Sequence, residues 1–235
     1  MTNIILDLLF PKRCVGCKKF DSYFCVECVA NIKQAELVCP KCEKSAVGGQ
    51  THPICRRHFG LDGLWSLGVY EDPLKKAIQK LKYDPKLVRD FVPVLVDIIL
   101  EYWARYQPFV FDQIKKDGGR GWVVIPVPLH WWRENKRGFN QSGEIGKLLS
   151  KNLGLEYSEI LKRTRYTWSQ AKLKSKERQK NIRGAFAVSD SALLSSYTNI
   201  LLIDDVWTTG ATLKECCYVL KRSGAKKVWA LTLAR

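Results

Sequence analysis

The chain has 235 residues, a formal net charge of +16 at pH 7 and 46% hydrophobic residues. This length fits one ordinary domain plus a small module, and the hydrophobic content is sufficient for a buried core. No uninterrupted apolar run is long enough to span a bilayer, and the start of the chain lacks the basic leader and the small-residue cleavage site of a signal peptide. The sequence therefore predicts a cytoplasmic protein without a membrane span.

Cysteines are concentrated in the first 60 residues, which hold seven of the nine in the chain, mostly as pairs separated by two residues. In a cytosolic chain such pairs are typical of zinc ligands, because the short spacer forms a turn that presents both thiolates to one tetrahedral ion. Metal would then supply much of the folding free energy of a segment with few apolar residues. The sequence predicts a zinc-ribbon module over residues 1–60; a reduced, metal-free set of thiols is the alternative.

The spacing of these residues predicts two groups of ligands, and hence one or two zinc ions. The first group consists of Cys14, Cys17, Cys25 and Cys28. The second group consists of Cys39, Cys42, Cys55 and His58, with His52 as the alternative for its last ligand.

Hydrophobic periodicity predicts a second domain over residues 61–235. Its expected elements are, in chain order, a strand at 63–70, helices at 73–82 and 86–106, a strand at 123–127, a helix at 143–153, a strand at 200–203, a helix at 213–222 and a strand at 227–233. Residues 107–121 are polar and contain glycine, which predicts a loop. The strand at 123–127 runs into a basic turn that suits an anion, with Arg133, Lys136 and Arg137 as candidates, although a solvated turn would have the same composition.

Positive charge is concentrated in residues 113–183, which carry 17 basic and 6 acidic side chains. This predicts a polyanionic ligand, nucleic acid, or both. Within it, residues 161–183 have few apolar side chains, which predicts a mobile segment. Three interpretations remain open for this segment: a flexible loop that closes over a ligand, a groove for single-stranded nucleic acid, or a solvated loop. The candidates for nucleic-acid contacts are Lys172, Lys174, Lys176 and Trp168.

Residues 200–212 combine a buried strand, two adjacent carboxylates and a small-residue loop that leads into a helix. Free backbone N–H groups at the helix start and threonine hydroxyls bind phosphate, and Gly210 allows a close backbone approach. Carboxylates would repel an anion unless the ligand also carries hydroxyl groups, so a ribose phosphate is expected. Asp204 and Asp205 would accept hydrogen bonds from its hydroxyls. The expected phosphate contacts are Thr208, Thr209, Gly210, Ala211 and Thr212; a solvated acidic pair beside a capped helix is the alternative.

This pattern resembles the motif with which type I phosphoribosyltransferases bind phosphoribosyl pyrophosphate (PRPP). The resemblance implies that PRPP, or a related ribose phosphate, binds together with Mg²⁺. In these enzymes the loop after the strand at 123–127 faces pyrophosphate. Arg133, Lys136 and Arg137 are the candidates for that role here.

The whole chain resembles the ComF family. The residues that carry this resemblance are the N-terminal cysteine pairs, Pro126-Val127-Pro128-Leu129, Arg137-Gly138-Phe139-Asn140-Gln141, the series Gln170, Arg178, Asn181 and Phe186, and the PRPP motif. The implied fold is α/β: a zinc ribbon joined to a type I phosphoribosyltransferase-like domain with a doubly wound, mostly parallel sheet. The chain departs from the family pattern at His58, Trp131, Trp132 and Trp207.

The resemblance implies a role in handling incoming single-stranded DNA during natural transformation. Implied partners are single-stranded DNA, a DNA-uptake helicase and recombination proteins. The alternative is an active phosphoribosyltransferase in nucleotide metabolism, in which the protein positions PRPP and neutralises its charge. The sequence contains no recognisable pocket for an acceptor, and it identifies no catalytic residue.

Overall fold

The computed structural model describes residues 11–106, 108–165, 175–191, 194 and 196–235. The strands are β1 (Gly63–Gly68), β2 (Trp122–Pro126), β3 (Glu156–Tyr157), β4 (Leu161–Arg163), β5 (Phe186–Val188), β6 (Asn199–Val206) and β7 (Lys227–Ala234). The helices are α2 (Val26–Ala30), α3 (Leu74–Tyr83), α4 (Pro85–Tyr106), α5 (Phe109–Lys116), α6 (Trp131–Arg137), α7 (Gln141–Leu153), α8 (Ser175–Ile182) and α10 (Ala211–Arg222), with short 3-10 turns η1 (Val47–Gly49) and η2 (Pro53–Cys55).

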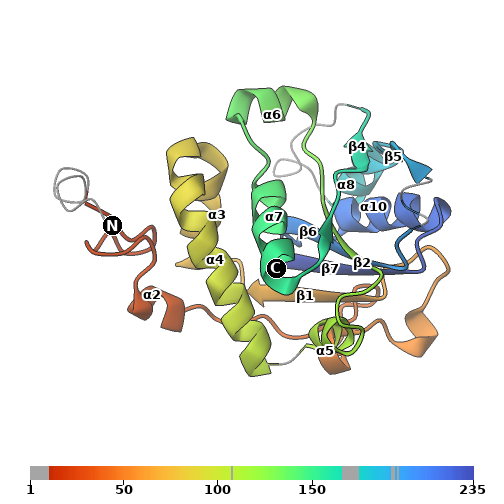
Figure 1. The fold of residues 1–235 in the computed structure, drawn as a ribbon, viewed down its shortest axis with the longest axis horizontal. Coiled ribbons are helices and arrows are strands. Elements are labelled where there is room, and N and C mark those ends of the chain that lie inside the picture. The colour runs from red at the N-terminus through yellow and green to blue at the C-terminus, as the bar shows by residue number, and fades with distance from the viewer. Residues whose placement is uncertain (1–10, 107, 166–174, 192–193, 195) are drawn as a thin grey trace.

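The centre of the fold is a five-stranded sheet in the order β1-β7-β6-β2-β3, in which every neighbouring pair is parallel (Figure 1). Parallel strands are buried on both faces and therefore carry continuous apolar runs. In β6, Ile200 and Leu202 join the core that contains α10, whereas Leu201 and Ile203 join the core that contains α4 and α7. The predicted α/β fold with a mostly parallel sheet is confirmed.

The connections of the sheet reverse direction between β2 and β6. From β2 the chain passes through α7 to β3 at one edge, and from β6 it passes through α10 to β7 on the other side. Ligands of open α/β sheets bind outside the carboxyl ends of the strands at such a reversal. The topology therefore places the loops that follow β2 and β6 next to each other, as the walls of a site.

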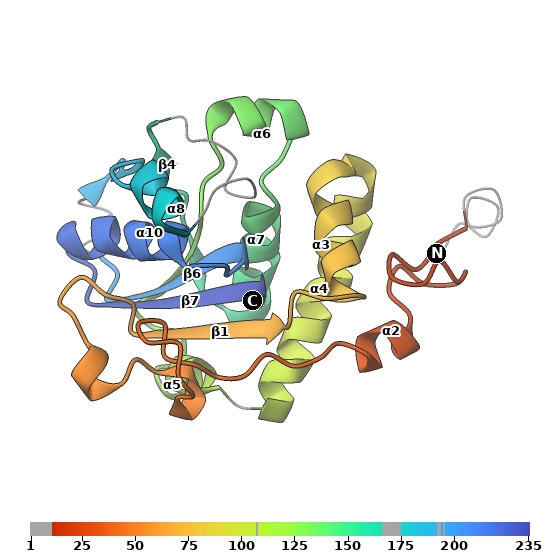
Figure 2. The ribbon, with the colours of Figure 1, turned by 180° about the vertical axis from the view of Figure 1, so that it is seen from behind.

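The cysteine-rich segment runs beside β1, the edge strand of the sheet (Figure 2). Its first part shares the core of α3 and α4, where Phe24 meets Phe91 edge-on at 5.8 Å between ring centroids. Its second part is joined to the start of β1 by a hydrogen bond from the Thr51 amide to the Asp62 carbonyl, 2.8 Å long. The predicted boundary at residue 60 stays a prediction, but the segments on its two sides share their hydrophobic cores.

One expectation about irregular segments was wrong. Residues 107–121 contain helix α5, because Val110 and Ile114, four residues apart, are buried against the main core and outweigh the polar composition. For the segment at 161–183, which was predicted to be mobile, the structure describes only the two ends: β4 pairs with β5 in an antiparallel ladder, and α8 is helical, so its mobility stays a prediction. Lys172, Lys174 and Trp168 lie outside the described residues. No helix in the described part of the chain has the length and apolarity that crossing a membrane requires.

Candidate functional site

A cavity of about 410 Å³ lies at the carboxyl edge of the sheet, between the loops that follow β2 and β6. Its walls combine two carboxylates with four cationic side chains, aromatic rings and threonine hydroxyls. The lining residues that bear on its chemistry are Tyr70, Lys82, Tyr83, Arg133, Arg137, Gln141, Arg163, Asp204, Asp205, Thr208 and Thr212. The structure thus brings the predicted acidic pair and two of the three predicted pyrophosphate-side residues into one cavity.

Asp205 is held by side chains from two different helices. The Lys82 ammonium at the end of α3 lies 2.6 Å from Asp205 Oδ2, and the Gln141 amide at the start of α7 donates to the same oxygen at 3.1 Å. Burial alone would lower the pKa of Lys82, but the charge of Asp205 outweighs this and raises it. Asp205 therefore has a counter-ion and a hydrogen-bond donor before any ligand binds.

Asp204 is in a different environment, although it is the neighbouring residue. Its Oδ1 accepts a hydrogen bond from the Asp205 backbone N–H at 2.9 Å. Burial, together with the charge of Asp205, raises the pKa of Asp204 to about 7. Desolvation disfavours a charged carboxylate, and a second negative charge adds to that effect. Near neutral pH this side chain can therefore exist with or without a proton.

The loop after β6 turns at Gly210, which has a left-handed backbone with φ of 66° and precedes the first residue of α10. A Cβ at Gly210 would lie 2.2 Å from the Trp207 ring, so glycine is required both by the backbone angle and by this contact. Thr208 and Thr212 line the cavity, whereas Thr209 and Ala211 line a neighbouring hollow. The predicted phosphate residues thus form one loop, but only part of it faces the acidic pair.

The basic wall is formed by a helix where the sequence predicted a turn. Helix α6 is capped by His130, whose Nδ1 accepts from the Trp132 backbone N–H at 3.4 Å. Arg133 and Arg137 line the cavity, and Arg137 also donates to Gln141 Oε1 at 3.2 Å. Lys136 is not among the lining residues; its ammonium lies 5.5 Å from the centre of the Trp132 ring.

Several cavity residues were missed by the sequence prediction as contacts of this site. The sequence prediction placed Lys82 only at the end of a predicted helix, and Gln141 only in the family pattern. Arg163 was assigned to the mobile basic segment, but it lies on β4, and burial lowers its pKa to about 10. The available signal was the apolar pair Ile160-Leu161 shortly before Arg163, which favours a short strand. Lys176 lies on α8, and the structure does not describe its side chain.

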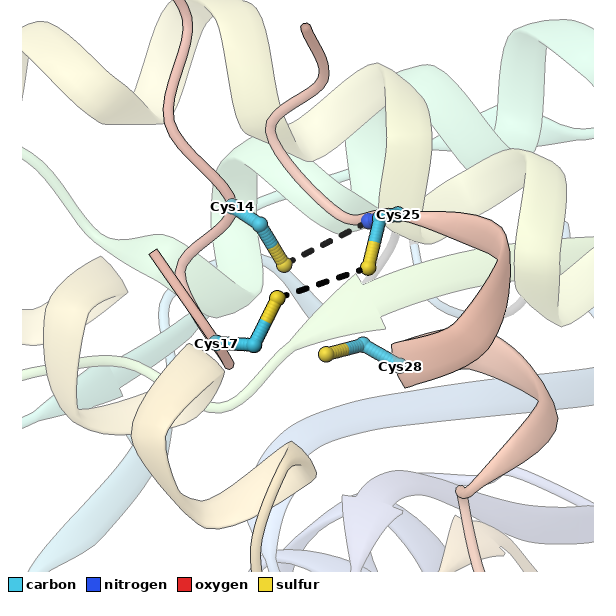
Figure 3. Close-up of side chains that lie close together, drawn as sticks. All are labelled: Cys14, Cys17, Cys25 and Cys28. Atoms are coloured by element: carbon cyan, nitrogen blue, oxygen red, sulfur yellow. Dashed lines mark hydrogen bonds between the residues drawn. The ribbon is translucent and has the colours of Figure 1, made fainter. Parts of the chain in front are cut away.

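The first predicted metal group is assembled in the structure. The thiols of Cys14, Cys17, Cys25 and Cys28 lie within 4.8 Å of one another and face a common centre (Figure 3). The 3.6 Å separation of the Cys17 and Cys25 sulfurs is close to the roughly 3.8 Å expected between two thiolates on a tetrahedral zinc. Burial favours the neutral Cys14 thiol, but backbone N–H donors outweigh it and lower the pKa of Cys14 to about 6. The donor set therefore fits zinc.

The second metal group contains His52 where the sequence favoured His58. Its members are Cys39, Cys42, His52 and Cys55. The His52 and Cys42 donor atoms are 3.4 Å apart, close to the roughly 3.6 Å expected around zinc. His52 Nε2 lies 2.9 Å from the Ser45 carbonyl; since a carbonyl can only accept, Nε2 carries the proton and Nδ1 is free to bind metal.

The reason for this correction is the turn η2. This turn brings His52 and Cys55 together with two residues between them, as in a cysteine pair, and the Cys55 amide donates to the His52 carbonyl. His58 instead packs its ring against Phe59, with 4.4 Å between ring centroids, and lies outside the group.

The two histidines provide a matched test of the second metal group. Protein purified without chelators is expected to contain about two zinc ions per chain, one for each group. His52→Ala should lower this to about one, because three thiolates hold the ion more weakly, whereas His58→Ala should leave it unchanged. Metal analysis by mass spectrometry measures both. Equal zinc loss in the two variants, or loss only in His58→Ala, would contradict the assignment.

The raised pKa of Asp204 predicts a specific pH dependence of stability. Its folded pKa lies above its unfolded value, so its contribution is complete at low pH and is lost as pH rises towards about 7. Relative to the neutral isostere Asp204→Asn, the free energy of unfolding of the wild type should fall by up to about 1.4 kcal/mol for each pH unit between about pH 5 and 7. Above about pH 8 the difference between the two proteins should stay constant. Urea unfolding of both proteins measures the difference. A difference that does not vary with pH would show that Asp204 remains ionised.

The chain is similar over most of its length to proteins named for competence and DNA utilization. It is 29% identical over 236 residues to Competence protein F of Haemophilus influenzae, covering 92% of this chain and 98% of that one. It is 28% identical over 214 residues to DNA utilization protein YhgH of Escherichia coli K12, covering 88% of each. It is 26% identical over 219 residues to Competence protein ComFC of Streptococcus pneumoniae, covering 92% and 89%.

No protein-family model matches the chain. The similarity to these relatives nevertheless extends over both the cysteine-rich segment and the α/β domain. It agrees with the cysteine pairs and with the motif at residues 200–212, whose acidic pair and loop meet at the carboxyl edge of the sheet. These similarities support the predicted resemblance of the chain to the ComF family.

Proposed function

We propose that this protein binds a ribose phosphate of the PRPP type and handles single-stranded DNA in natural transformation. The names of its relatives, which refer to competence and DNA utilization, support the biological role. The ligand class is inferred from the lining of the cavity at the carboxyl edge, which contains both acidic and basic side chains. Few ligands need both carboxylates and several cations, and a sugar that carries phosphates is one that does.

The acidic part of the cavity suits the hydroxyl groups of the sugar. Asp204 and Asp205 are adjacent on β6 and both line the cavity. Ionised carboxylates accept hydrogen bonds strongly, and Lys82 with Gln141 keeps Asp205 oriented. The ribose hydroxyls would donate to these oxygens.

The remaining walls suit the phosphates. Thr208 and Thr212 flank the start of a twelve-residue helix, where backbone N–H groups favour an anion. Arg133, Arg137 and Arg163 line the same cavity and are candidates for the pyrophosphate. Mg²⁺ would enter with the diphosphate, because it retains water and binds largely through substrate phosphates. Its role would be to neutralise phosphate charge.

Ligand binding can be tested by thermal unfolding. PRPP with Mg²⁺ should raise the melting temperature, because a ligand that binds only the native state stabilises it by mass action. Asp204→Ala combined with Asp205→Ala should abolish this shift. The matched control, Asp97→Asn with Glu101→Gln, removes two exposed charges from α4 and should keep it.

Two simpler ligands separate the two halves of the cavity in the same assay. Ribose 5-phosphate tests the acidic pair and the phosphate loop, and inorganic pyrophosphate tests the arginines. Arg133→Ala with Arg137→Ala should weaken the response to PRPP and pyrophosphate but not to ribose 5-phosphate. A normal PRPP response in the acidic double variant would refute the ribose assignment.

DNA binding can be tested by filter binding over a salt series. Affinity for single-stranded DNA should fall steeply with salt, because each neutralised phosphate releases condensed counterion. Trp168→Ala should weaken single-strand binding by about 1–3 kcal/mol if one base stacks on that ring. Replacing Lys172, Lys174 and Lys176 by alanine should reduce the salt slope. The PRPP-induced stabilisation should survive these changes.

The opposite result has a clear meaning. Negligible affinity for single-stranded DNA at physiological salt, with or without PRPP, would refute DNA handling. If the lysine changes then impaired release of pyrophosphate from PRPP, the alternative of an active phosphoribosyltransferase would be favoured.

A further inference from the structure

Two adjoining hollows of about 450 and 800 Å³ lie between the second metal group and the loop at the start of α10. They share Lys41, Phe59 and Lys214 as lining residues and therefore form one groove. The groove touches the loop at Thr208 and Thr209 but contains neither Asp204 nor Asp205. The groove shares Cys55 with the second metal group and part of the loop with the predicted phosphate site, but most of its lining residues belong to neither.

Aromatic rings are exposed along this groove. Phe59 and Tyr218 are 38% and 39% exposed, and their rings meet edge-on with 5.4 Å between centroids. The His58 ring also packs edge-on against Phe59, with 4.4 Å between ring centroids. Large aromatic side chains that remain exposed while packed against one another form a pre-organised platform, because little rotamer freedom is left to lose on binding.

The charged side chains of the groove are mostly cationic. The basic residues are Lys41, Arg57, Arg183 and Lys214, and the acidic residues are Glu43 and Glu215. Both acids already have partners. Glu215 accepts from the Gly184 amide at 2.7 Å, and Glu43 lies 4.0 Å from the Lys214 ammonium.

Lys214 is held in place at the junction of the two hollows. Its ammonium donates to the Thr209 carbonyl at 3.0 Å and lies 4.9 Å from the centre of the Trp207 ring. The cation nearest the loop is therefore fixed, whereas Lys41 and Arg57 are exposed. Charge complementarity favours a polyanion as the occupant of this groove.

We propose that this groove is a binding surface for single-stranded DNA. The phosphates follow Lys41, Arg57 and Arg183, and unstacked bases pack against Phe59 and Tyr218. A single strand offers both features at once, whereas a duplex keeps its base faces covered and an acidic peptide has no need of exposed rings. The inference rests on the proposed DNA-handling function and assigns it to described residues outside segment 166–174.

The aromatic contribution is tested by fluorescence anisotropy with a labelled oligothymidine strand at physiological salt. Tyr218→Ala should weaken binding roughly tenfold, because base stacking on an aromatic ring is lost. Tyr218→Phe keeps the ring and should bind like the wild type. The matched control is Tyr106→Ala, since Tyr106 on α4 is also 39% exposed but lies outside the groove.

The cationic contribution is tested with charge reversals in the same assay. Lys41→Glu combined with Arg57→Glu should weaken binding more than tenfold and reduce the salt slope. The control, Arg120→Glu with Lys151→Glu, makes the same change of net charge at two exposed residues elsewhere and should have a much smaller effect. Zinc content and the PRPP-induced thermal shift, measured on every variant, verify that the fold and the neighbouring cavity are intact.

Each outcome supports or overturns the proposal. If the wild type binds the strand but the groove variants bind as tightly as their controls, the groove assignment is wrong while DNA handling stands. If the wild type does not bind the strand, both fail. If thymidine monophosphate competes as well as the strand at equal nucleotide concentration, the occupant is a free nucleotide and the proposal is overturned.

Discussion

Strand β6 is hydrogen-bonded along both edges, to β2 on one side and to β7 on the other, and all three run in the same direction. This pairing determines where the loops of the site can lie. The Val127 amide after β2 bonds to the Ile203 carbonyl, and the Trp207 amide after β6 bonds to the Ala234 carbonyl, each at 2.8 Å. The loops therefore leave the sheet at one edge with little freedom, and the acidic pair is held by the backbone ladder itself.

Two adjacent carboxylates at the end of a buried strand are costly, because burial and mutual repulsion both disfavour their charged forms. The fold offsets this cost asymmetrically. Lys82 and Gln141 come from α3 and α7, on the same face of the sheet, and both contact Asp205, while Asp204 is left with a raised pKa. Because Gln141 also accepts from Arg137, the acidic and basic walls of the cavity are joined by direct hydrogen bonds. A substitution in one wall is therefore expected to change the positions of side chains in the other.

The two cysteine groups are attached to different parts of the α/β domain. Cys14 and Cys28 are buried in the core that contains α3, the helix that carries Lys82. The second group lies beside the groove, which Cys55 helps to line. Zinc bound to these groups would thus stabilise the surroundings of the cavity as well as the cysteine-rich segment, because metal binding is coupled to folding of the chain that holds the ligands.

Features that depend on neighbouring residues could be predicted from the amino-acid sequence alone. Apolar runs and periodicity predicted the strands β2, β6 and β7 and the helices α3, α4, α7 and α10, because burial of one face imposes its period locally. The motif at residues 200–212 and the paired cysteines are also local, since one turn or one loop carries most of their geometry. Even here, burial of Val110 and Ile114 made a helix out of a stretch whose polar composition predicted a loop.

Contacts between side chains that are distant in the sequence could not be predicted in this way. Lys82 and Arg163 enter the cavity from α3 and β4, and Asp205 is more than one hundred residues from Lys82 in the chain. The choice of His52 over His58 likewise depends on how turn η2 faces Cys39 and Cys42. No local pattern specifies such contacts, because they arise from the packing of whole elements against the sheet. Each element is held by burial of its apolar face, and this packing determines which polar side chains come together at the site.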